Sequence, residues 1–258
     1  MTVQRPSAAY RWLYKMWSGF RSVLYFSWLR QLYFRGIYNE KLTGLKFVVI
    51  YGQGRTGSTL LANALAAHES VCYDQEVLRR PLMHYKSFVQ GQAKKMGKDI
   101  WYVLKVKPMH LNRLGLSLGG MLRSLGGHQV VLIHLARHNH FEHAISKIIA
   151  SERNEYAQKI MGKKVHINVQ YLKDKIDELS NNLQHERDEM KGMEFSGLTY
   201  EGDLASAEAL ELTLNSILEK LGLTRGGQIP KSKKVLSTNL ADEILNWEEV
   251  KMLADEKA

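Results

Sequence analysis

The chain has 258 residues, 45% of them hydrophobic and 24% charged, with a formal net charge of +10. This composition is that of an ordinary soluble globular protein, and the length suffices for one sizeable α/β domain with an extension. A single cysteine, Cys72, excludes an internal disulfide and any metal site built from cysteines. The positive charge favours an anionic ligand or surface, namely nucleotide phosphates, nucleic acid or acidic lipid.

Targeting and membrane signals are absent from the sequence. No run of about 18 uncharged apolar residues occurs, so we expect no membrane-spanning helix. The first residues lack the apolar core and small-residue cleavage site of a secretory signal. We therefore expect a cytoplasmic protein, with peripheral contact with a membrane as the open alternative.

Residues 1–44 differ from the rest of the chain and predict a helical N-terminal arm. Aromatic residues are concentrated there, and every charged residue before Glu40 is basic. Such a helix can lie in a membrane interface. It can equally pack on its own domain or on a partner subunit, as in a homodimer. The apolar positions at helical spacing are Trp12, Met16, Phe20, Leu24, Trp28 and Leu32.

From residue 45 onward, buried-strand patterns alternate with helical patterns. The strand candidates are Lys46–Tyr51, 101–107, 129–135 and 195–200, and the helix candidates are 58–67, 141–150, 172–183 and 210–221. Gly222 is the expected C-cap of the last helix. This alternation predicts an α/β fold over residues 45–258, a three-layer, P-loop-like domain with a central parallel sheet flanked by helices.

A glycine-rich turn with the sequence GQGRTGST, residues 52–59, joins the first strand to the first helix. Glycines allow positive φ angles and turn backbone N–H groups inward around phosphate oxygens, and the positive end of the helix adds to this. Ser58 stands where an NTP-hydrolysing P-loop carries lysine. No strand-end aspartate for Mg²⁺ is evident either, which disfavours γ-phosphoryl transfer. Arg55 instead supplies a cation inside the loop.

The stretch GQGRTGSTLLANAL resembles the 5'-phosphosulfate loop of sulfotransferases that use 3'-phosphoadenosine-5'-phosphosulfate (PAPS). It is most similar to the bacterial and carbohydrate-type group, whose loop has an R-[ST]-G-S-T-L-L core. The resemblance implies that Arg55 is the catalytic cation at the bridging oxygen of the donor. The donor contacts that it implies in this loop are Gly54, Arg55, Thr56, Gly57, Ser58 and Thr59.

A second motif lies at residues 134–146, where HLARHN is followed by AIS. It resembles the 3'-phosphate element of the same family, a strand followed by R-x-N-x6-S. Arg137 leaves a predicted strand at the carboxyl edge of the sheet, the edge where open α/β folds bind ligands. Its guanidinium group suits a terminal phosphate, and the Ser146 hydroxyl adds a second contact. Taken alone, an arginine after a strand is more often in a surface ion pair.

Two further segments resemble catalytic elements of the family. The sequence LKVK, residues 104–107, resembles its second-strand lysine element, which implies that Lys105 or Lys107 assists Arg55 at the leaving oxygen. The sequence YDQEVL, residues 73–78, resembles the stretch that often carries a glutamate base.

The general base therefore has two candidates. Glu76 is the first, provided that burial raises its pKa toward neutrality. His110, just past the second strand of the pattern, is the competing candidate. A solvated surface carboxylate with no catalytic role is the remaining interpretation of Glu76.

Weaker resemblance extends toward the C-terminus and covers residues 46–253 in all. The sequence LTYEGDL, residues 198–204, resembles a late "YEDL" strand end, with Gly202 in place of the usual acid. NWEEV, residues 246–250, is similar to the terminal helix. The basic segment expected over the 3'-phosphate comprises Lys231, Lys233 and Lys234.

Histidines cluster around the second motif, and His134 and His138 have the HxxxH spacing. That spacing makes a metal pair only on one continuous helix, whereas here it spans a predicted strand and the loop after it. We therefore expect core and surface histidines and no metal requirement.

These patterns predict a sulfotransferase that moves a sulfuryl group from PAPS to an acceptor hydroxyl by in-line displacement, releasing adenosine 3',5'-bisphosphate. The expected acceptor is a carbohydrate, a glycolipid or another alcohol. A P-loop kinase or NTPase and a non-catalytic protein that binds nucleotides or polyanions remain the alternatives. Nucleic acid is not an expected partner, since no RRM, zinc-finger or helix-turn-helix signature is present.

Overall fold

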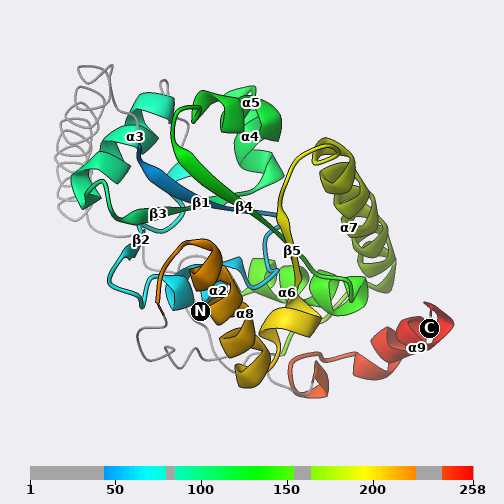
Figure 1. The fold of residues 1–258 in the computed structure, drawn as a ribbon. Helices are drawn as coiled ribbons and strands as arrows, with labels where there is room; N and C mark the ends of the chain where they lie inside the picture. Colours follow the sequence, from blue (N-terminus) through cyan, green and yellow to red (C-terminus); the bar gives the residue numbers. More distant parts are fainter. Residues whose placement is uncertain (1–43, 80–84, 154–163, 225–239, 258) are drawn as a thin grey trace, which may run out of the picture.

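The computed structural model describes residues 44–79, 85–153, 164–224 and 240–257 (Figure 1). The predicted N-terminal arm, apart from Gly44, and the basic segment at 231–234 lie outside the described residues. The strands are β1 (Lys46–Tyr51), β2 (Val71–Tyr73), β3 (Trp101–Val106), β4 (Gln129–Ala136) and β5 (Ser196–Thr199). The α-helices are α2 (Ser58–Leu65), α3 (Tyr85–Met96), α4 (Pro108–Leu114), α5 (Leu118–Ser124), α6 (His140–Glu152), α7 (Val169–Glu189), α8 (Ala207–Lys220) and α9 (Trp247–Lys257). Short turns are the 3-10 helices η1 (Val77–Arg79) and η3 (Leu240–Asp242) and the π-helical turn η2 (Tyr200–Leu204).

The five described strands form one parallel sheet in the order β2-β3-β1-β4-β5. β1 lies at its centre, where Lys46 pairs with Trp101 of β3 on one side and with Gln129 of β4 on the other. The predicted α/β fold with a central parallel sheet flanked by helices is confirmed.

Helices cover both faces of the sheet, and β1 shows why its sequence is apolar throughout. Phe47, Val49 and Tyr51 belong to a core with α3, α4 and α5 on one face. Val48 and Ile50, whose side chains point the opposite way, belong to a core with α2 and α8 on the other face (Figure 1). A parallel strand covered on both sides needs apolar residues at every position, so KFVVIY predicts a buried strand.

A third apolar core joins α6, α7 and α9 beyond the β4–β5 side of the sheet (Figure 1). The amphipathic stripe predicted for 172–183 is confirmed, because Leu172, Ile176, Leu179 and Leu183 are all buried on α7. α6 packs along α7, and Ile145 and Ile149 fill the space between them. α6 is thereby held against α7.

The predicted helix 58–67 ends earlier, at Leu65, with Ala66 as its C-cap. At the end of α8, Gly222 has a φ of 69° and its N–H donates to the Glu219 carbonyl, while the Leu223 N–H donates to Leu218. This is the hydrogen-bond pattern of a glycine-terminated helix, as predicted for that position.

All parallel strands present their carboxyl ends at one edge of the sheet. The 52–57 turn after β1, Lys107 after β3, Arg137 after β4 and η2 after β5 therefore meet there. None of the helices among the described residues is both long and apolar enough to cross a membrane.

Candidate active site

Two glycines fix the shape of the turn after β1. Gly52 has a φ of 152°, and a Cβ at this position would lie 2.3 Å from the Leu135 carbonyl oxygen of β4. Gly57 has a φ of 86° at the N-cap of α2, and its Cβ would lie 2.9 Å from the ring of Tyr200. Because the first N–H groups of a helix have no intrahelical acceptor, the turn presents donors at the start of α2.

Arg55 lies in this turn with a φ of 71°, a left-handed conformation that is uncommon for residues other than glycine. Its Nε donates to the Ser146 hydroxyl of α6 at 3.1 Å. The structure thus brings the two predicted donor-binding motifs into direct contact. Within the part of the chain that the structure describes, Arg55 makes no ion pair.

Both threonine hydroxyl groups of the turn make hydrogen bonds within the protein. Thr56 is buried and its Oγ1 donates to the Gln53 carbonyl at 3.0 Å. Thr59 accepts a hydrogen bond of 2.6 Å from the Lys105 ammonium group. Ser58 is buried at the first position of α2. The Thr56 hydroxyl proton is therefore committed to the protein, whereas Thr59 accepts from Lys105 and keeps its own O–H as a donor beside the backbone N–H groups.

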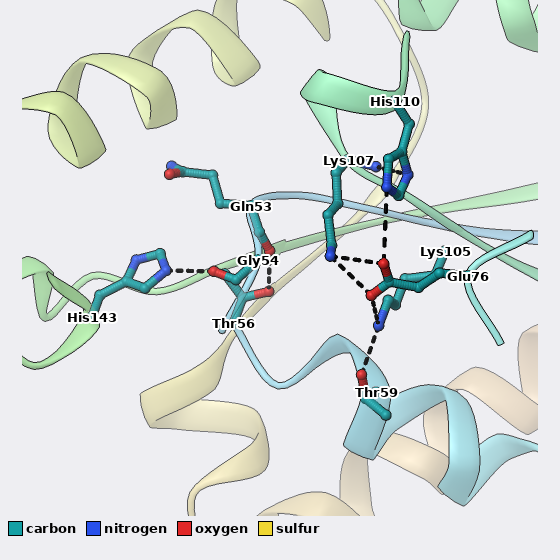
Figure 2. Close-up of polar contacts among 9 residues, drawn as sticks. All are labelled: Gln53, Gly54, Thr56, Thr59, Glu76, Lys105, Lys107, His110 and His143. Atoms are coloured by element: carbon teal, nitrogen blue, oxygen red, sulfur yellow. Dashed lines mark hydrogen bonds and ion pairs between the residues drawn. The ribbon is translucent and has the colours of Figure 1, made fainter. Parts of the chain in front are cut away.

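A carboxylate–lysine cluster lies beside the turn (Figure 2). Glu76, from the segment between β2 and η1, approaches Lys105 of β3 at 2.6 Å. It also pairs with Lys107, the N-cap of α4, at 2.8 Å and 3.0 Å. His110 lies 3.9 Å from the same carboxylate. The three candidates that the resemblance assigned to this region, and the competing base His110, therefore converge.

The two lysines lower the pKa of Glu76. Burial raises this pKa, but hydrogen bonds and attraction from Lys105 and Lys107 outweigh burial and lower the pKa from 4.5 to about 2. The condition on which Glu76 was a candidate base, a pKa raised by burial, is therefore not met in this structure, because the two cations outweigh desolvation. As the structure has it, Glu76 is a counter-ion and a very weak base.

His110 is also a weak base in this structure. Burial is the main cause that lowers its pKa, with Lys107 adding to it, to about 4, so the imidazole is neutral at pH 7. Its Nδ1 lies 3.3 Å from the backbone N–H of Lys107 and accepts from it. The ring proton is therefore on Nε2, the nitrogen that faces Glu76. Lys105 has a lowered pKa, chiefly because of burial, which Glu76 partly offsets.

Arg137 lies at the carboxyl end of β4, as predicted, but it is already paired. It is 9% exposed and pairs with Glu142 at 2.8 Å and with Glu201 at 3.7 Å. Its guanidinium group lies 4.7 Å from the centre of the Tyr200 ring. The Glu201 carboxylate also accepts the main-chain N–H groups of residues 138–139. The alternative of an ion pair for Arg137 is thus realised, and its phosphate contact stays a prediction.

Sequence reasoning missed a set of α6 and loop residues that contact the turn. His143 Nε2 lies 2.7 Å from the Gly54 carbonyl oxygen. Lys147 reaches the side-chain oxygen of Gln53 at 3.5 Å, and Gln53 donates to the Leu179 carbonyl of α7. Positions 143, 146 and 147 share one helix face, so the helical spacing carried a signal beside Ser146.

The remaining candidates lie outside the described residues or elsewhere in the fold. Lys233 and Lys234 lie outside the described residues. His134 is buried in β4 and pairs with Glu186 of α7 at 3.0 Å, while His138 lies in the loop that follows. Among the described residues, no group of three or more histidine, cysteine or acidic side chains is arranged to hold a metal ion.

Comparison with known proteins finds similarity to a solved structure but to no family model or curated protein. Among solved structures, the chain is similar to the sulfotransferase domain from the curacin biosynthetic pathway, with 14% sequence identity and a TM-score of 0.46. The match covers 78% of this chain and 83% of that one. At this identity and TM-score, the likeness does not bear on the reaction.

Proposed function

We propose that this chain is a sulfotransferase that transfers a sulfuryl group from PAPS to an acceptor hydroxyl. The observation that supports it most is the position of Arg55. Its guanidinium group lies in a P-loop-like turn, is hydrogen bonded to the neutral Ser146 hydroxyl, and makes no ion pair among the described residues. A positive charge that no carboxylate compensates is suited to an anion with a phosphate and a sulfate at adjacent positions.

The cations of the site match the charge that develops during sulfuryl transfer. As the bond between sulfur and the 5'-phosphate oxygen breaks, its electron pair passes to the departing adenosine 3',5'-bisphosphate. Arg55 stabilises this negative charge and cannot supply a proton, because a guanidinium group stays protonated in proteins. Lys105 and Lys107, which meet at Glu76, add positive charge at the same edge of the sheet.

The acceptor oxygen forms the new bond to sulfur and loses its proton to a base. We assign that role to Glu76, which gains basicity when the donor sulfonate draws the lysines away from it. Its pKa of about 2 is due to Lys105 and Lys107, and without their hydrogen bonds the effect of burial raises the pKa. His110 is the alternative proton acceptor, and it can take the proton at the nitrogen that faces Glu76 only after its own ring proton has moved from Nε2 to Nδ1.

The 3'-phosphate is assigned to Arg137 and Ser146, the second motif. Arg137 Nε has no hydrogen-bond partner among the described residues although the atom is buried. A phosphate there competes with the carboxylates of Glu142 and Glu201. We therefore expect the 3'-phosphate to displace at least one of these two acids.

The acceptor class follows from the sequence resemblance alone. We propose a carbohydrate or glycolipid hydroxyl, since the arginine-containing loop is similar to that of the carbohydrate-type group. A basic, aromatic arm at residues 1–44 fits a lipid-linked acceptor at a membrane surface.

The deciding experiment measures transfer of labelled sulfate from PAPS to a panel of sugars, glycolipids, phenols and alcohols. Wild type is compared with Arg55→Ala and with Arg123→Ala, which changes an exposed arginine of α5. We expect Arg55→Ala to lose transfer by about 100-fold or more, while calorimetry still detects binding of adenosine 3',5'-bisphosphate. Arg123→Ala is expected to behave as wild type.

Three other results would each point elsewhere. If the wild type binds no adenosine 3',5'-bisphosphate, the proposal is wrong. Mg²⁺-dependent turnover of ATP would favour the kinase or NTPase alternative. Binding of the bisphosphate without transfer to any acceptor would favour a non-catalytic nucleotide-binding protein.

A further inference from the structure

One face of α6 contacts the turn after β1 at three points. His143, Ser146 and Lys147 reach Gly54, Arg55 and Gln53 respectively. Figure 2 shows His143 on the side of the turn opposite to the lysines and Glu76. Of these three contacts, the one from His143 is the shortest, at 2.7 Å, and it is made to the main chain.

The chemistry of the contact fixes which ring nitrogen of His143 carries the proton. A carbonyl oxygen only accepts hydrogen bonds, so Nε2 must donate to Gly54. The pKa of His143 is lowered to about 3, mainly by burial, so the ring is neutral and Nδ1 has a lone pair. Nδ1 is buried and has no hydrogen-bond partner among the described residues. The single proton of the ring is thus committed to the turn.

The bond from His143 orients the peptide group between Gly54 and Arg55. Because a trans peptide is planar, its carbonyl and its N–H point in opposite directions. With the Gly54 carbonyl held toward α6, the Arg55 N–H points away from α6. The residue that follows this fixed peptide, Arg55, has the left-handed φ of 71°. A left-handed arginine is strained unless its surroundings hold it, and the bonds from His143 and to Ser146 hold it on both sides.

We propose that His143 is a positioning residue, which holds the Gly54–Arg55 peptide so that the Arg55 N–H points away from α6 and donates to the phosphosulfate of the donor. The donor never needs to touch His143. If this peptide turned over, the Gly54 carbonyl would face the phosphosulfate and a donor would be replaced by a repelling oxygen. This inference rests on the proposed function, because the anion that the turn receives is the phosphosulfate of PAPS.

A packing role makes a different prediction from a positioning role. If His143 only fills space, an apolar side chain of similar size should replace it without loss. If its N–H is required, glutamine should replace it and leucine should not, because the glutamine amide places a donor near the position of Nε2. The comparison of His143→Gln with His143→Leu therefore separates the two roles.

The test uses the full chain and adenosine 3',5'-bisphosphate as the probe. Isothermal calorimetry gives its Kd for wild type, His143→Gln, His143→Leu and Ile149→Val. The last variant shortens a buried side chain of the same helix in the core shared with α7. We expect His143→Leu to raise the Kd about tenfold, the effect of one lost hydrogen bond, and His143→Gln and Ile149→Val to stay within about twofold of wild type.

Amide hydrogen exchange supplies a readout that needs no ligand. In the unliganded protein, we expect exchange across residues 52–59 to be faster in His143→Leu than in wild type and unchanged in the other two variants. The inference is overturned if His143→Leu binds and exchanges as wild type does, or if His143→Gln behaves as His143→Leu. If His143→Leu does not fold, His143→Asn replaces it, since its shorter amide cannot reach Gly54.

Failure of the proposed function gives a different result from failure of this inference. If the wild type binds no bisphosphate, the proposed function is wrong, and the exchange comparison alone decides whether His143 holds the turn. If the wild type binds the bisphosphate and His143→Leu is unaffected, the proposed function stands and His143 is a packing residue.

Discussion

Replacing Glu76 by glutamine removes the negative charge that Lys105 and Lys107 share. The carboxylate is 24% exposed and lies within 3.0 Å of both ammonium groups, whereas Lys105 is only 5% exposed. A neutral amide at position 76 leaves a buried cation without its counter-ion and facing a second cation. Such a loss is strongly destabilising in buried ion pairs.

The expected loss of unfolding free energy in Glu76→Gln follows from the pKa of Glu76. Its fall from 4.5 to about 2 corresponds to about 3 to 4 kcal/mol, at about 1.4 kcal/mol for each pH unit. Lys105 has a lowered pKa because of burial, and its partial deprotonation in the variant reduces the loss. We expect Glu76→Gln to lower the free energy of unfolding by about 2 to 3 kcal/mol at pH 7.

The stabilisation that Glu76 provides increases with pH. A carboxyl group whose pKa is lowered in the folded protein stabilises the fold above its ordinary pKa of 4.5 and loses this effect as the pH falls toward 2. The difference between wild type and Glu76→Gln should therefore be complete at pH 7 and fall to less than half at pH 3.

Urea unfolding of both proteins at pH 7 and at pH 3 measures these differences. Glu194→Gln, a change at an exposed glutamate between α7 and β5, is the matched control and should change the free energy of unfolding by less than about 0.5 kcal/mol. A difference for Glu76→Gln that is the same at both pH values would refute the assignment of its stabilising effect to a charge shared with lysines.

Two further substitutions test the geometry at the edge of the sheet. Gly52→Ala should prevent stable folding, because its Cβ would lie 2.3 Å from the Leu135 carbonyl oxygen of β4. Circular dichroism and thermal melting of the purified protein check this. Glu201→Gln should tighten binding of adenosine 3',5'-bisphosphate about three- to tenfold, since it removes a negative charge next to Arg137. It should also lower the unfolding free energy by about 1 kcal/mol through weaker acceptance from residues 138–139, and a Kd equal to that of wild type would contradict the charge argument.

The sheet was predictable because its central strands carry the pattern within themselves. β1 was predicted with both ends correct, and the predicted strands at 101–107 and 129–135 differ from β3 and β4 by one residue each. β2 was missed because three residues, VCY, show no periodicity. α4 and α5 have seven residues each, and helices of that length depend on packing against the sheet rather than on their own sequence.

Those site residues were predictable that belong to a short motif recognisable in the sequence. Arg55 was singled out from its place in the glycine-rich turn and from the resemblance of that turn to the family's loop, and Ser146 from the resemblance of residues 134–146 to the 3'-phosphate element. The lowered pKa of Glu76 was not predictable from the sequence. Its partner Lys107 is 31 positions away, and only the order of the strands brings the two side chains together. Glu201 likewise follows β5, yet it binds the main chain after β4, 63 positions earlier.

Among the described residues, carboxylates pair with Arg137 but not with Arg55 at the carboxyl edge of the sheet. This difference implies that the 5'-phosphosulfate contributes more to the affinity of the donor than the 3'-phosphate does. Arg137 is paired with Glu142 and Glu201, so a 3'-phosphate gains attraction there only by displacing a carboxylate. Arg55 is hydrogen bonded to the neutral Ser146 hydroxyl. The 5'-phosphosulfate can therefore approach its positive charge without displacing a carboxylate. We therefore expect adenosine 5'-phosphosulfate, which lacks the 3'-phosphate, to bind only about tenfold more weakly than PAPS in calorimetry. Loss of affinity by about 1,000-fold would show that Arg137 exchanges its carboxylates for phosphate readily, and that the 3' end dominates recognition.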